Sequence, residues 1–162
     1  MDTNLRFRSA AEDDTGLILR FIKALAEFEH LSDKVSADEA LLREWLFDKK
    51  IAEVIFAVAD GKEVGFALFF HSFSTFLGKA GIYLEDLYVI PEFRGLGYGK
   101  ALMKKLARIA AERGCGRFEW QCLDWNRAGI DFYLSLGAEP LTDWTLYRVS
   151  GKSLLDLAYE DT

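Results

Sequence analysis

The sequence has few cysteines, histidines and prolines, and it lacks long apolar runs. Its two cysteines, Cys115 and Cys122, are too few for a secreted disulfide scaffold and too far apart for a Cys-x-x-Cys redox or zinc motif. His30 and His71 belong to no His-Glu-x-x-His motif or Cys/His cluster, so we expect neither a metal site nor a Ser-His-Asp triad. No apolar run reaches the roughly 18 residues of a membrane span, and the first residues lack a signal-peptide layout. We therefore expect a cytoplasmic protein without a membrane partner.

Basic residues are also scarce relative to acidic ones. Twenty Lys and Arg against 26 Asp and Glu give a net charge of −6. Nucleic-acid phosphates call for a basic face, so a nucleic-acid partner is not expected. The acidic excess would suit a small cationic substrate if carboxylates gather at a cleft. A negative net charge more often serves only to keep a protein in solution, and this is the simpler explanation of the acidic excess.

Apolar residues, by contrast, are abundant, and their spacing predicts alternating strands and helices. Hydrophobic residues make up 51% of the 162 residues, enough for one domain over residues 1–162 with a full core. We expect strands at 5–8, 52–59, 64–73, 82–90, 117–123 and 144–149, and helices at 13–30, from 36, and at 102–113, 126–136 and 152–159. This order predicts an α/β (α+β) fold with a mixed, mostly antiparallel sheet and helices on both faces.

A glycine-rich loop joins the predicted strand 82–90 to the predicted helix 102–113. Pro91 ends the strand, because proline cannot donate to a sheet ladder. The loop then places a glycine at every second position: Gly95, Gly97 and Gly99. Glycine lets backbone N–H groups approach an anion, and the first turn of a helix leaves such groups unpaired. The loop is therefore a candidate diphosphate site, the simpler alternative being a tight turn before a surface helix.

Two common nucleotide-binding motifs do not fit this loop. The dinucleotide fingerprint needs glycine at position 100, which is Lys100, and the P-loop needs Gly and Ser or Thr where Arg94 and Ala101 stand. The pattern that fits is Arg-x-x-Gly-x-Gly over residues 94–99. It resembles the pyrophosphate-binding motif of the GNAT superfamily of acyl-coenzyme A-dependent N-acyltransferases.

The resemblance extends over nearly the whole chain. The stretches IKALAEFEHLSDKV, YLEDLYVIPEFRGLGYGKALM and LDWNRAGIDFYLSLGAEP are similar to the diamine acetyltransferases, that is, the spermidine/spermine and thialysine N-acetyltransferases. The resemblance implies the GNAT fold, acetyl-CoA as co-substrate without a metal, a small cationic amine as partner, and a homodimer.

It also implies sites for both substrates. Backbone groups of Leu87, Tyr88 and Val89 match positions that pair with the pantetheine arm and the acetyl carbonyl. The diphosphate loop corresponds to Arg94, Gly95, Leu96, Gly97, Tyr98, Gly99 and Lys100, and a second cofactor segment to Asn126, Arg127, Ala128 and Gly129. The amine would meet Phe28, Glu29, Glu85, Asp86, Glu119, Trp120, Gln121 and Asp143.

Acyl transfer to an amine needs a base for the ammonium and an acid for the departing thiolate. Glu85 is the candidate base, because it lies in an otherwise apolar strand where partial burial would tune a carboxylate for proton transfer. In a regular strand Asp86 would point to the opposite face, whereas a bulge could bring both side chains toward the cleft. Tyr133 is the candidate acid, since a phenol of pKa ~10 can protonate a thiolate of pKa ~8.5. An ion-paired surface carboxylate and a core aromatic are the simpler explanations of these residues.

The leading hypothesis is acetyl transfer from acetyl-CoA to a primary amine of a polyamine, a diamine, thialysine or a related amino acid, by direct attack in a ternary complex. Two alternatives remain open. One is a coenzyme A-binding regulatory module without turnover, which needs the loop but neither acid nor base. The other is acetylation of a protein or peptide amine.

Overall fold

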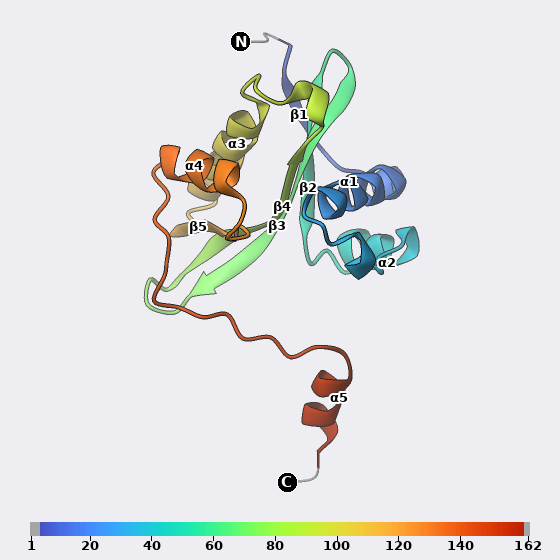
Figure 1. Cartoon of the computed structure of the whole chain (residues 1–162), viewed down its shortest axis with the longest axis vertical. Coiled ribbons are helices and arrows are strands. Elements are labelled where there is room, and N and C mark those ends of the chain that lie inside the picture. The colour runs from blue at the N-terminus through green and yellow to red at the C-terminus, as the bar shows by residue number, and fades with distance from the viewer. Residues whose placement is uncertain (1–3, 161–162) are drawn as a thin grey trace. The chain divides into compact units, whose positions relative to one another are not determined.

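The computed structural model of the chain describes residues 4–160, which form two compact units divided between Leu123 and Asp124. The first unit is built on a five-stranded sheet in the order β1-β2-β3-β4-β5 (Figure 1). Its strands are β1 (Arg6–Ser9), β2 (Glu53–Ala59), β3 (Lys62–Ser74), β4 (Lys79–Val89) and β5 (Arg117–Trp120). The first four pair in antiparallel fashion and β5 runs parallel to β4, so the predicted mixed, mostly antiparallel sheet is confirmed.

Helices cover both faces of this sheet, as predicted. Helices α1 (Thr15–Phe28) and α2 (Glu39–Arg43) lie on one side, and α3 (Tyr98–Glu112) lies on the other (Figure 1). Short 3-10 turns occur at Glu12–Asp14, Ser32–Lys34 and Pro91–Phe93, and a π-helical turn at Glu44–Asp48 follows α2. The second helix begins later than the predicted start at residue 36, where Ser36-Ala37-Asp38-Glu39 has the pattern of a capping box. The residue that caps it is Asp38, because the Leu41 N–H donates to Asp38 Oδ1 at 2.8 Å.

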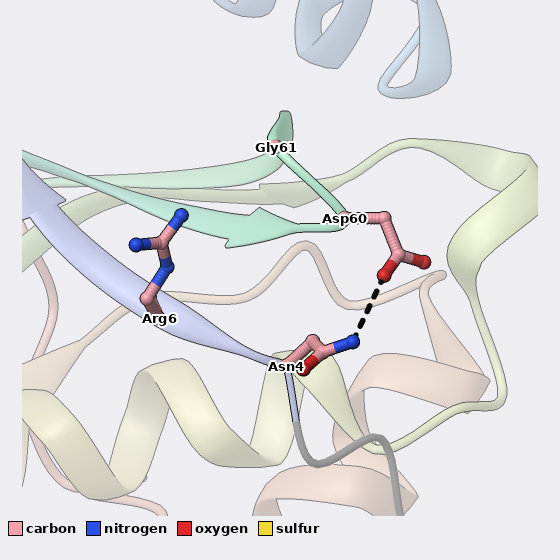
Figure 2. A pocket seen from close by; sticks show the side chains of 4 residues that line it. All are labelled: Asn4, Arg6, Asp60 and Gly61. Carbon is pink, nitrogen blue, oxygen red and sulfur yellow. Dashed lines mark hydrogen bonds between the residues drawn. The ribbon is translucent and has the colours of Figure 1, made fainter.

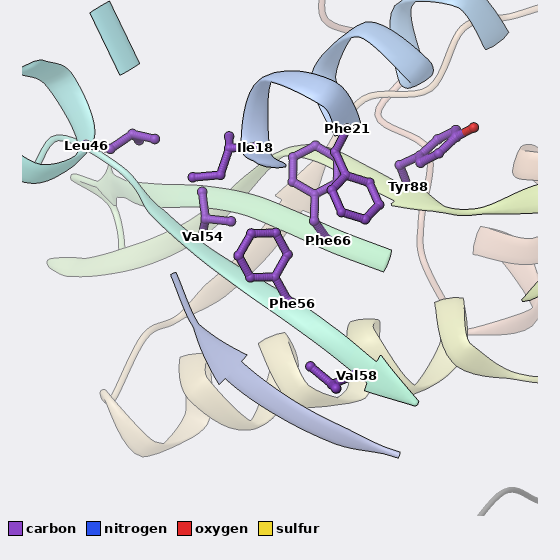
Figure 3. Packing of buried hydrophobic residues seen from close by; sticks show 8 residues of the cluster. All are labelled: Ile18, Phe21, Leu46, Val54, Phe56, Val58, Phe66 and Tyr88. Atoms are coloured by element: carbon purple, nitrogen blue, oxygen red, sulfur yellow. The ribbon is translucent and has the colours of Figure 1, made fainter. Parts of the chain in front are cut away.

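Aromatic side chains hold α1 against the sheet. Phe21 of α1 stacks on Phe66 of β3 with ring centroids 5.1 Å apart, and meets the ring of Tyr88 of β4 edge-on at 6.2 Å. The buried cluster consists of Ile18, Phe21, Leu46, Val54, Phe56, Val58, Phe66 and Tyr88 (Figure 3). Tyr88 stands at the edge of this cluster with its hydroxyl directed away from the other labelled side chains. The core therefore ends at the strand that carries the predicted site.

The second unit contains α4 (Arg127–Ser135) and α5 (Gly151–Tyr159), close to the predicted helices. The predicted strand at 144–149 is wrong: no strand within residues 4–160 pairs with this segment, and the exposed fractions of Trp144 and Tyr147 are 80% and 89%. An alternating pattern becomes a strand where a neighbouring strand takes up its N–H and C=O groups, and within the described part of the chain this segment has no such neighbour. No helix among the described residues is long and apolar enough to cross a membrane.

Candidate functional site

Strand β4 carries a bulge at the predicted base. Leu68 of β3 stands opposite Asp86 and the next residue, Phe69, stands opposite Leu84, so Glu85 is the extra residue of β4. A bulge interrupts the alternation of side chains along a strand and redirects those beside it. Glu85 and Asp86 are therefore released from the strictly opposite orientations of a regular strand.

The bulge places Asp86 on the face covered by α1. Paired residues of an antiparallel ladder point to the same face, and Leu68, the partner of Asp86, packs against the buried cluster. Asp86 is half-buried, and this burial raises its pKa to about 6, with further contributions from the negative charges of Glu85 and Glu29. Burial also raises the pKa of Glu29, which follows the last residue of α1. The result is a cluster of three carboxylates in which negative charge is unfavourable, so a cation would be attracted.

The predicted partial burial of Glu85 is wrong, because this side chain is exposed. The reason is the bulge, which turns Glu85 out of the ladder and leaves Asp86 packed over the sheet. Two consecutive acidic residues within an apolar strand are a signal for such a bulge, since a regular strand would bury one of them.

One edge of β4 lies open beside these carboxylates. Strand β5 pairs with β4 from Gly81, opposite Arg117, to Leu84, opposite Trp120, and ends there. Residues 86–89 of β4 therefore pair with β3 on one side and extend past the end of β5 on the other. An open strand edge presents N–H and C=O groups that an extended ligand can pair with.

The ladder with β3 decides which backbone groups face this open edge. The Ile90 N–H donates to the Val64 carbonyl at 2.9 Å, so this pair is hydrogen-bonded. Hydrogen-bonded and non-hydrogen-bonded pairs alternate in an antiparallel ladder, which turns the backbone groups of Val89 and Leu87 outward and those of Tyr88 toward β3. Of the three residues predicted to hold the pantetheine arm, Leu87 and Val89 thus offer their N–H and C=O groups.

The glycine loop leads from this edge to the N-terminus of α3. Gly95 (φ 77°) and Gly97 (φ 86°) adopt left-handed conformations that favour glycine, and Gly97 is the N-cap of the helix. No side chain caps the first turn, and a Cβ at either glycine would meet no atom within 4 Å. Uncapped N–H donors beneath open space fit a diphosphate. The loop residues therefore suit the diphosphate of acetyl-CoA.

Arg94 connects this loop with the predicted amine site. Its Nε donates to the Val89 carbonyl at 2.9 Å. Its guanidinium carbon lies 4.9 Å from the ring centroid of Phe28, at the end of α1, and 5.1 Å from that of Tyr88. A residue predicted to hold the cofactor and one predicted to contact the amine are thus in direct contact.

The remaining predicted residues of the first unit belong to the end of β5. Glu119 forms an ion pair with Arg117, with 3.2 Å between Arg117 Nε and Glu119 Oε1. Trp120 pairs with Leu84, and Leu84 immediately precedes the bulge residue Glu85. Gln121 follows the strand and is exposed. Register thus places Trp120 beside the residue of β4 that precedes the bulge.

Except for Asp143, the other predicted residues, which belong to the second unit, lie on or at the start of helix α4. Asn126 caps it, its Oδ1 accepting from the Gly129 N–H at 3.0 Å, and a Cβ at Gly129 would come within 2.6 Å of the Asn126 amide. Glycine at 129 is therefore part of the cap. Tyr133 is half-buried on the same helix, with its ring 5.3 Å from that of Phe132, and Asp143 is exposed beyond the helix.

A surface hollow lies elsewhere, where β1 meets the turn between β2 and β3 (Figure 2). It is lined by Asn4, Arg6, Asp60 and Gly61, and Asn4 Nδ2 donates to Asp60 Oδ1 at 3.3 Å. None of the predicted site residues lines it. Across residues 4–160, no group of three or more His, Cys, Asp or Glu side chains could hold a metal ion.

A mixed sheet with an open edge on β4, followed by an uncapped glycine loop, has a geometry that suits an extended, diphosphate-bearing ligand. The model of the Acetyltransferase (GNAT) family matches residues 19–138, and the chain belongs to this family of acyltransferases. Thialysine N-epsilon-acetyltransferase of Bos taurus is 40% identical over 163 residues, which cover 93% of this chain and 95% of the relative.

Two further comparisons extend this relationship. The Homo sapiens spermidine/spermine N(1)-acetyltransferase-like protein 1 is 34% identical over 167 residues, covering 96% of this chain and 24% of that protein. The solved structure of an integron cassette protein from the mobile metagenome of V. cholerae superposes with a TM-score of 0.81 at 29% identity, covering 98% of this chain and 99% of that one. The predicted GNAT fold is confirmed.

Replacing Asp86 with asparagine is expected to raise the free energy of unfolding at about pH 7.5 by up to about 3 kcal/mol. The pKa of Asp86 in the folded protein, about 6, exceeds its ordinary value of 3.8, so folding is favoured at low pH and loses stability as the pH rises through about 6. Asparagine avoids this loss. Urea unfolding at about pH 7.5 and about pH 4 measures the effect, which should fall below about 1 kcal/mol at the lower value, where Asp86 is protonated in the folded protein. The exposed Asp143→Asn is the control, and equal gains in both variants would contradict the raised pKa.

Proposed function

We propose that this acyltransferase moves an acetyl group from acetyl-CoA to a primary amine of a small cationic molecule: a polyamine, a diamine, thialysine or a related amino acid. The observation that carries the proposal is the carboxylate cluster of Glu29, Glu85 and Asp86 beside the open edge of β4. Desolvated negative charge favours binding of an ammonium group. The names of the bovine and human relatives support the same substrate class.

The coenzyme would lie along β4 and across the loop. When bound, it supplies the activated acetyl carbonyl. The outward N–H and C=O groups of Leu87 and Val89 would pair with the pantetheine amides, while the N–H groups at the start of α3, with Arg94 and Lys100, would hold the diphosphate. The resemblance adds the segment Asn126–Gly129 at the start of α4 as a second contact.

The amine must lose a proton before it attacks, and we assign its removal to Glu85, directly or through water. Its exposed position on the bulge leaves the carboxylate accessible to a ligand on β4. Asp86, with a pKa of about 6, is largely ionised at neutral pH and supplies the negative charge that holds the ammonium group. Phe28 adds an aromatic face, which attracts cations.

Tyr133 is the proposed acid for the departing thiolate, on the strength of the resemblance and of phenol chemistry. It belongs to the second unit, and the matched residues 19–138 include parts of both units. We therefore propose that the two units together form a single acetyltransferase domain.

We further propose a cytoplasmic homodimer, following the resemblance. Cys115 and Cys122 do not form a disulfide, as in a reducing compartment. The second unit carries large apolar side chains with exposed fractions of about half or more, which would suit an interface: Leu141, Trp144, Leu146, Tyr147, Val149, Leu154, Leu155, Leu157 and Tyr159. Cytoplasmic diamines or amino acids would be the substrates.

A regulatory module without turnover explains the structure less fully. It needs the glycine loop but neither the carboxylate cluster nor Tyr133, and the acetyltransferase relatives favour turnover. The acidic cluster would also attract a basic peptide, so a peptide amine is a second possible substrate class. The assay described next distinguishes a peptide from a small amine.

The proposal is tested by thiol release from acetyl-CoA with spermidine, spermine, putrescine, thialysine, ornithine, lysine and a basic peptide. We expect turnover with at least one small amine and little with the peptide. Coenzyme A binding by calorimetry without turnover on any amine would instead support the regulatory module. Turnover confined to the peptide would overturn the small-molecule substrate.

Tyr133→Phe is expected to lower kcat by about 100-fold or more, because the variant keeps the ring but loses the proton donor. The exposed Tyr147→Phe in the same unit is the matched control and should keep wild-type turnover. Steady-state kinetics with saturating acetyl-CoA measures both variants. Unchanged turnover in Tyr133→Phe would remove the residue from the mechanism.

The pH profile separates the roles of the two adjacent carboxylates. In the wild type, kcat/KM for the amine should fall below pH 6, because protonation of Asp86, whose pKa is about 6, removes the charge that holds the ammonium. Asp86→Asn should raise KM and abolish this acidic limb. Glu85→Gln should lower kcat about 100-fold and move the limb to lower pH, because Glu85 contributes to the raised pKa of Asp86. A fall in kcat confined to Asp86→Asn would reverse the two assignments.

A further inference from the structure

The side chain of Arg94 folds back over the strand that precedes its loop. Its Nε donates to the Val89 carbonyl at 2.9 Å, and its guanidinium carbon lies over the rings of both Phe28 and Tyr88, at 4.9 and 5.1 Å. No carboxylate among residues 4–160 forms an ion pair with Arg94. Two aromatic faces and one carbonyl therefore hold this cation.

The place that Arg94 occupies has the properties of a cation site. Ring faces of Phe and Tyr attract cations; Tyr88 is 9% exposed and Phe28 is 40% exposed, so the site is partly open to water. Phe28 immediately precedes Glu29, and Tyr88 lies two residues after Asp86 on the same face of β4. The aromatic pair thus adjoins the carboxylate cluster that the proposed function assigns to the ammonium group of the substrate.

We propose that Arg94 fills this cation site in the coenzyme-free protein and leaves it when a diphosphate binds at the loop, so that the substrate cation can enter. The inference rests on the proposed function, because it requires coenzyme A to bind over residues 94–100. It makes Arg94 a positioning residue whose two locations link the coenzyme site to the amine site.

The exchange follows from the strengths of the competing contacts. A guanidinium forms two charge-assisted hydrogen bonds to a phosphate, and these are stronger than a cation–π contact at an exposed position. Arg94 is exposed and stands at the start of the glycine loop, so its side chain can turn toward an anion there. Its departure also frees the Val89 carbonyl, one of the outward groups of β4 that a pantetheine amide would use.

This exchange makes binding of the two substrates cooperative. Coenzyme A removes the internal cation and so strengthens amine binding, and by linkage the amine strengthens coenzyme binding by the same factor. The expected order is coenzyme before amine.

The movement of Arg94 can be observed at Phe28 without catalysis. We would place 4-fluorophenylalanine at position 28 and record its fluorine resonance while coenzyme A is added. The wild-type resonance should shift toward that of coenzyme-free Arg94→Met, whose own resonance should change little with coenzyme A. The control is the same fluorine label at Phe69, whose ring lies 5.9 Å from the guanidinium carbon of Arg113 at the C-terminal end of α3. Its resonance should not shift when coenzyme A is added.

Calorimetry measures how coenzyme A changes the affinity of the protein for thialysine. Wild type should bind thialysine at least about tenfold more tightly with coenzyme A present than without it. Arg94→Met should bind it in the absence of coenzyme nearly as tightly as loaded wild type does, because the site is already vacant. Arg94→Lys, which keeps a cation, should restore a substantial part of the difference.

The outcomes separate this inference from the proposed function. If coenzyme A binds and thialysine turns over, but the Phe28 resonance stays still or Arg94→Met gains no affinity for thialysine, the exchange is overturned while the enzyme assignment stands. If coenzyme A does not bind at all, both fail.

Discussion

The structure depends on one irregularity in a ladder, the extra residue in β4. Because Leu68 pairs with Asp86 and Phe69 with Leu84, the alternation of β4 is reset at Glu85. The half of the strand beyond the bulge then presents Tyr88 to the core and Asp86 to the side of α1, while Leu87 and Val89 turn their backbone groups to the open edge. One inserted residue thus sets the positions of the acidic groups and of the groups that would pair with the coenzyme.

The carboxylates of Glu29, Glu85 and Asp86 near the end of α1 lower the stability of the folded protein. Asp86 is half-buried beside two like charges, which is unfavourable for its ionised form until a cation arrives. Function accounts for such an arrangement, since groups held in unfavourable environments cluster at binding and catalytic sites. The aromatic faces of Phe28 and Tyr88 complete a surface suited to an ammonium or a guanidinium group, and Arg94 is the guanidinium that lies there.

Much of the fold was predictable from sequence, because its signals are local. The Arg-x-x-Gly-x-Gly loop, the Asn126 cap and the order of strands and helices need no knowledge of distant contacts. The errors have tertiary causes. The strand predicted at 144–149 has no neighbour to pair with among the described residues, and the second helix is capped by Asp38 although Ser36 offered an equally good local signal.

The sequence by itself determined the family of the protein and the loop that would bind a diphosphate. Glycine conformation and helix ends depend on contiguous residues, so a short stretch of sequence is enough to reveal such a loop. Only the tertiary structure decided that Asp86 rather than Glu85 is half-buried, and that Arg94 rests on Phe28. Both outcomes depend on the register between β3 and β4 and on where α1 ends over the sheet. Pairing and packing between segments far apart in the chain set these relations, and no short stretch of sequence contains them.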